Sequence, residues 1–76
     1  MKTFKVGDRV KCKDDEAYYV TTSLADLVVT KILTRSLVKV RLVDHKIGKF
    51  KSLIGSEYDV ANRHFVKLNN FKGNIK

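Results

Sequence analysis

The chain has 76 residues with one cysteine and no proline or tryptophan, and 16 Lys and Arg against 8 Asp and Glu give it a formal net charge of +8. This length predicts one domain, and a lone cysteine excludes an internal disulfide framework. We expect a cytoplasmic protein, because no apolar run has the length of a signal peptide or of a membrane span.

The first element covers residues 4–13 and combines a Gly-Asp pair with strict alternation. Gly7 suits a turn that needs a positive φ, and Asp8 suits hydrogen bonding to nearby amides. Beyond the turn, Val10 and Cys12 point to one face, which makes Cys12 a small core residue. The basic side chains point to the other face: Arg9, Lys11 and Lys13.

Residues 14–26 read as a long loop that contains the adjacent pair Tyr18 and Tyr19. Neighbours in extended chain point to opposite sides, so one tyrosine faces the fold and the other is exposed. The sequence leaves open which of them is exposed. The acidic run at 14–16 is interpreted as a solvated loop, because it lacks the spacing of a calcium site.

Two strands follow. Residues 28–33 are β-branched and apolar, but Leu27, Val29 and Ile32 share a face only if the strand bulges. A tight turn is expected at 34–36. Residues 37–43 then alternate most clearly of all, with Val38, Val40 and Leu42 inward and Lys39 and Arg41 outward.

The remaining elements are short. Residues 44–48 predict a turn with Gly48 at a positive φ, and a fourth strand is expected from Lys49 and Phe50, interrupted at Gly55, with Tyr58 at its far end. Residues 59–63 suit one 3-10 turn and residues 64–68 a last strand. Residues 69–76 are interpreted as a tail, from which Phe71 can fold back.

This order of elements resembles the SH3-like small β-barrel over residues 4–68. The resemblance rests on a Val-Gly-Asp-x-Val opening, here residues 6–10, and on Tyr58 followed by Arg63-His64-Phe65-Val66 at the close. It implies an all-β, five-stranded barrel at residues 1–68 with a 3-10 turn before the last strand. It is most similar to stand-alone phage and bacterial accessory proteins. The expected inward residues are Val6, Val10, Val38, Val40, Leu42, Phe65 and Leu68.

We expect no enzyme. Gly7-Asp8-Arg9-Val10 resembles the opening of plasmid-type dihydrofolate reductases, but the Gln-Ile pair of their catalytic segment is absent here. His45 and His64 have no cysteine or carboxylate at ligand spacing. We therefore predict no catalytic, cofactor or metal site.

The predicted function is binding of an acidic partner, because the charge is concentrated over residues 27–56. One hypothesis is a small phage-type accessory protein that docks on a host or phage protein, with Leu24, Phe50 and the exposed tyrosine as anchors. The alternative is a barrel that binds nucleic acid without sequence specificity. We expect no membrane partner, and a monomer or weak homo-oligomer. The candidate binding residues are Arg9, Lys11, Lys13, Tyr18, Tyr19, Lys39, Arg41, Lys46, Lys49 and Lys51.

Overall fold

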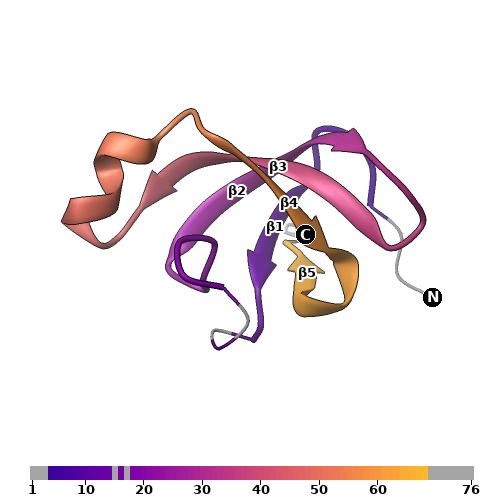
Figure 1. Ribbon diagram of the computed structural model, residues 1–76, viewed down its shortest axis with the longest axis horizontal. Helices are drawn as coiled ribbons and strands as arrows, with labels where there is room; N and C mark the ends of the chain where they lie inside the picture. Colours follow the sequence, from indigo (N-terminus) through magenta and orange to yellow (C-terminus); the bar gives the residue numbers. More distant parts are fainter. Residues whose placement is uncertain (1–3, 15, 17, 69–76) are drawn as a thin grey trace, which may run out of the picture.

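The computed structural model describes residues 4–14, 16 and 18–68. Their strands form one antiparallel sheet in the order β4-β3-β2-β1-β5 (Figure 1). The elements are β1 (Arg9–Cys12), β2 (Ala25–Ile32), β3 (Leu37–His45), η2 (Gly48–Leu53), β4 (Glu57–Ala61), η3 (Asn62–His64) and β5 (Phe65–Lys67). The all-β fold and the 3-10 turn before the last strand are confirmed, but the sheet is not closed into a barrel, and β4 and β5 are its edges.

The β2–β3 hairpin turns at 34–36, as predicted. The Thr34 hydroxyl accepts hydrogen bonds from the backbone N–H groups of Ser36 and Leu37, both at 3.1 Å. The register of the pair shifts between Val29 and Lys31, so the expected bulge is present. Beyond the bulge Ile32 pairs with the buried Val38 and so shares the face of Leu27 and Val29, although it stays 43% exposed at the end of its strand.

The core lies on the inner face of the sheet. Of the residues predicted to point inward, Val10, Val38, Val40, Leu42 and Phe65 are buried. Val6 is 63% exposed, so that prediction is wrong, and Leu68 is only half-buried. The reason is the turn at Gly7, which has a φ of 97°: Phe4, two residues before Val6, packs into the core instead.

The stretch between β3 and β4 differs from the prediction. Gly48 has no positive φ but begins η2, and the left-handed position is Gly55, with a φ of 99°. Phe50 lies within this 3-10 segment, where its ring packs 4.8 Å from that of His45 and is buried. Packing of Phe50 against His45 therefore takes precedence over the local strand propensity of residues 49–50, and in Figure 1 η2 projects beyond the end of β3.

The last strands begin later than expected. β4 extends to Ala61, because Tyr58 and Val60 pair with Val40 and Val38. The 3-10 turn accordingly starts at Asn62, and β5 follows it directly. The tail predicted for residues 69–76, with Phe71, lies outside the described residues.

Candidate functional site

An open groove of about 300 Å³ lies between the loop at residues 18–21 and residues 58–60 of the edge strand β4. Tyr18 anchors the loop side. Its hydroxyl accepts a hydrogen bond of 3.0 Å from the N–H of Ala61, and its ring packs 5.5 Å from that of Phe65. Tyr18 is thus the tyrosine that faces the fold, and it forms a fixed wall of the groove.

Tyr19 is the exposed tyrosine, with 71% of its surface accessible. Its ring meets Phe50 edge to face at 5.2 Å. The Lys49 ammonium lies 5.6 Å from the centre of the Tyr19 ring and donates a hydrogen bond of 3.2 Å to its hydroxyl. Phe50 is buried beneath this pair, so its assignment as an exposed anchor is wrong, whereas Leu24 remains 39% exposed.

A buried histidine holds the loop in place, and sequence reasoning missed it. His45 is 1% exposed. Its Nδ1 accepts the N–H of Ile47 at 3.1 Å, so Nε2 carries the proton and donates to the Val20 carbonyl at 2.9 Å. The cause is a register shift: Leu27 faces Leu42 and Asp26 faces Asp44, so Val43 is an extra residue that reverses the alternation and turns His45 inward.

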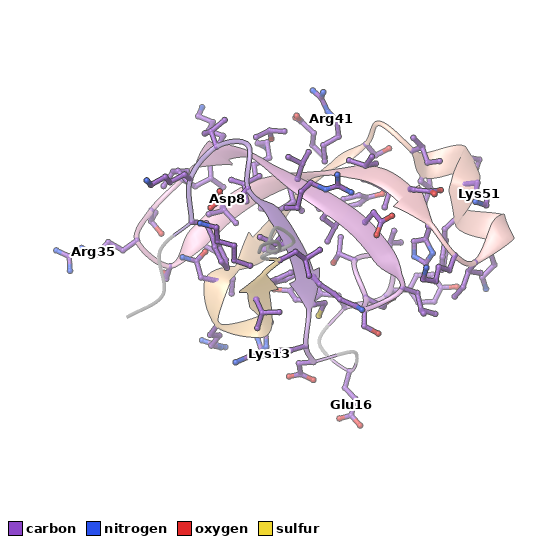
Figure 2. All side chains as sticks on the ribbon, turned by 180° about the vertical axis from the view of Figure 1, so that it is seen from behind. Asp8, Lys13, Glu16, Arg35, Arg41 and Lys51 are labelled. Carbon is purple, nitrogen blue, oxygen red and sulfur yellow. The ribbon has the colours of Figure 1, made fainter. Side chains whose placement is uncertain are left out.

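The predicted basic residues do not form one free face. Three of them are paired with carboxylates: Lys39 with Asp59 at 3.0 Å, Arg41 with Glu57 at 3.3 Å, and Lys51 with Asp44 at 3.2 Å. The β3–β4 register places Lys39 directly opposite Asp59 and Arg41 directly opposite Glu57. Figure 2 shows Arg41, Lys13 and Lys51 on three different sides of the molecule.

The cations without an ion pair in the described part of the chain include Lys46 in the turn after β3 and the row that begins on β1: Arg9, Lys11 and Lys13. On the outer face of the sheet, Arg9 lies opposite Val28 of β2 and Lys11 opposite Val66 of β5, and strands β2 and β3 separate this row from the acids of β4. The candidate residues therefore divide into a tyrosine groove with Lys49 and a separate basic row along β1.

Two of the ion pairs shift a pKa. The hydrogen bond to Asp59 raises the pKa of Lys39, since it favours the charged ammonium. The backbone N–H of His45, and after it the Lys51 ammonium, lower the pKa of Asp44.

Asp44→Asn is expected to lower the melting temperature at neutral pH, because the carboxylate holds the turn after β3. A carboxyl whose folded pKa lies below its ordinary value of 3.8 stabilises the fold above that value, and the contribution is lost as the pH falls through the folded pKa. Thermal melts of parent and variant should therefore converge in acid. A gap that stays constant from neutral pH into acid would contradict this role for Asp44.

Among the residues that the structure describes, no group of three or more His, Cys, Asp and Glu side chains is placed to hold a metal ion. The helices of the same segments are all too short or too polar to cross a bilayer. Comparisons with protein-family models, with curated proteins and with solved structures find no match to the chain.

Proposed function

We propose that this chain is a small interaction protein that binds another protein through its tyrosine groove, as phage-type accessory proteins do with host or phage proteins. The observation that supports the proposal is the groove itself, where Tyr18, Tyr19 and Tyr58 meet at an open sheet edge. Tyrosine is enriched among the residues that dominate protein interfaces. The SH3-like architecture is part of the same proposal, favoured by the strand order and by the 3-10 turn before β5.

Tyr19 is suited to be the central anchor. Its ring is exposed, yet the edge contact with Phe50 and the hydrogen bond from Lys49 already restrict it. A side chain held in this way loses little rotamer freedom on binding, so more of its contact energy contributes to affinity. Lys49 adds positive charge beside it, which steers an acidic partner towards the groove.

Tyr19→Ala should weaken partner binding by about 2 kcal/mol or more, since a central interface tyrosine is removed. The matched control is Val6→Ala, another exposed apolar side chain, which lies outside the groove lining. The partner is the protein that immobilised chain retains from a bacterial lysate after nuclease treatment. Its affinity for parent and variants is then measured at low and high salt.

A protein interface anchored by tyrosine keeps most of its affinity at high salt, because salt mainly screens the steering. Equal losses for Tyr19→Ala and Val6→Ala would contradict the proposed anchor.

The second candidate function is nucleic-acid binding, and the basic row of Arg9, Lys11 and Lys13 is the observation that favours it. Three phosphate contacts predict a slope of roughly −2.7 for log affinity against log salt. Under this alternative, nuclease removes the retained material, Lys11→Gln weakens binding, and Tyr19→Ala alone leaves the salt slope unchanged.

A further inference from the structure

The pairing of β3 with β4 fixes which main-chain groups of β4 face away from the sheet. The Asn62 N–H donates to the Ser36 carbonyl and the Leu42 N–H donates to the Ser56 carbonyl, both at 2.9 Å. These two bonds mark hydrogen-bonded pairs at the two ends of the ladder. In an antiparallel ladder such pairs alternate with pairs whose N–H and C=O groups point outward.

Counting from either end, Tyr58 and Val60 bond to β3, whereas Glu57, Asp59 and Ala61 direct their main-chain groups to the open side. The contact of Ala61 agrees with this alternation, because its outward N–H donates a hydrogen bond of 3.0 Å to the Tyr18 hydroxyl. Within residues 4–14, 16 and 18–68, no hydrogen bond reaches the main-chain N–H or C=O of Asp59 from that side. Asp59 also lines the groove.

We propose that the groove takes an extended segment of the partner protein, which adds to β4 as a further strand. This inference rests on the proposed function and names its binding mode. The guest strand exchanges main-chain hydrogen bonds with Asp59 and Glu57, whose outward groups have the spacing that a strand requires. The Tyr18 hydroxyl already accepts a hydrogen bond from the Ala61 N–H, so the hydrogen bonds between β4 and the guest strand end before Ala61.

The groove also defines which side chains the guest presents. The guest residue opposite Asp59 lies on the outer face, beside a carboxylate with 57% of its side chain exposed. The guest residues on either side of it point to the inner side, against Tyr18, Tyr58 and Val60, which line the groove. The matching segment therefore has an apolar, basic, apolar order.

A second copy of this chain fits the edge poorly. In a twofold pairing of β4 with β4, registers centred on residues 57, 58 or 59 place Glu57 or Asp59 opposite a carboxylate of the other copy. Like charges directly across an antiparallel pair are destabilising. The occupant is thus a different chain with a basic residue at the central position.

The test uses a capped peptide probe, Thr-Val-Lys-Val-Thr, and the same peptide with a methyl group on the lysine backbone nitrogen. The parent should bind the first probe saturably, with shifted and slowly exchanging Asp59 and Glu57 amides by NMR. The methylated probe lacks one main-chain donor and adds a methyl clash, so it should bind at least about 10-fold more weakly.

Two variants of the protein test the same main-chain hydrogen bonds from the side of β4. Asp59→Pro removes an outward N–H and no bond to β3, and should also lose about 10-fold or more in affinity. Asp59→Ala keeps that N–H and should retain more of the binding than Asp59→Pro. Thermal melts check the fold, and if Asp59→Pro fails to fold, the two probes on the parent decide.

Absence of binding, equal binding of both probes, or self-association that shifts the same amides would each overturn strand addition. Equal binding with shifts at Tyr18 and Tyr58 would leave the proposed docking groove intact. A natural partner that is insensitive to Tyr19→Ala would instead contradict the proposed function while strand addition stands.

Discussion

Val40→Asp should lower the melting temperature by roughly 15–30 °C, which corresponds to about 4 kcal/mol for a domain of this size. Val40 is 0% exposed and lies in the middle of β3, between Val29 on β2 and Tyr58 on β4. Among the described residues no buried Lys or Arg is available to pair with an aspartate at this position, so an unpaired carboxylate is buried. A protein of this length has a total stability of about 4–11 kcal/mol, so the change removes much of it.

The same strand offers a matched control. Val43 is 40% exposed and is the extra residue at the bulge, so Val43→Asp places the same charge in solvent. Circular dichroism melts of the two variants therefore separate burial from charge. An unchanged melt for Val40→Asp would show that the inner face of β3 has been assigned wrongly.

Local alternation predicts the strand faces well because each side-chain direction depends only on neighbouring residues. It therefore places Val10 and Cys12 on β1 and Val38, Val40 and Leu42 on β3 correctly. It fails after Leu42, because a single extra residue reverses the pattern and no local signal marks it. The burial of His45, and of Phe50 packed against its ring, follows from that one register shift.

The charge pairs were missed for a related reason. Lys39 and Arg41 are outward, as predicted, but the sequence does not show that β4 brings Asp59 and Glu57 across from them. Ion pairing between strands depends on register, which is a non-local property. The sequence thus identifies a strand with basic side chains, but it does not show which of those side chains form ion pairs.

The groove depends both on the local sequence pattern and on contacts between residues far apart in the chain. The sequence indicates that one member of the tyrosine pair is exposed, and the choice of Tyr19 depends on a contact over a long separation, the bond from the Ala61 N–H to Tyr18. The open edge of β4 depends on the order of the whole sheet. Neither can be obtained from the residues of the loop alone.

His45→Phe is expected to destabilise the protein by about 3 kcal/mol, because it keeps an aromatic ring but leaves the Val20 carbonyl and the Ile47 N–H without their partners. The control is Lys46→Ala, an exposed change at the next position. The loss should be concentrated in the groove, since Val20 belongs to its lining.

Hydrogen exchange measured by NMR should therefore be faster at residues 18–24 in His45→Phe than in the parent. This increase in exchange rate should be larger than the increase at β1. Uniform acceleration over the whole sheet would indicate that His45 supports the core in general. Acceleration confined to the loop would identify His45 as the residue that positions the two tyrosines, and the affinity of any partner for the groove should then fall even where the sheet remains folded.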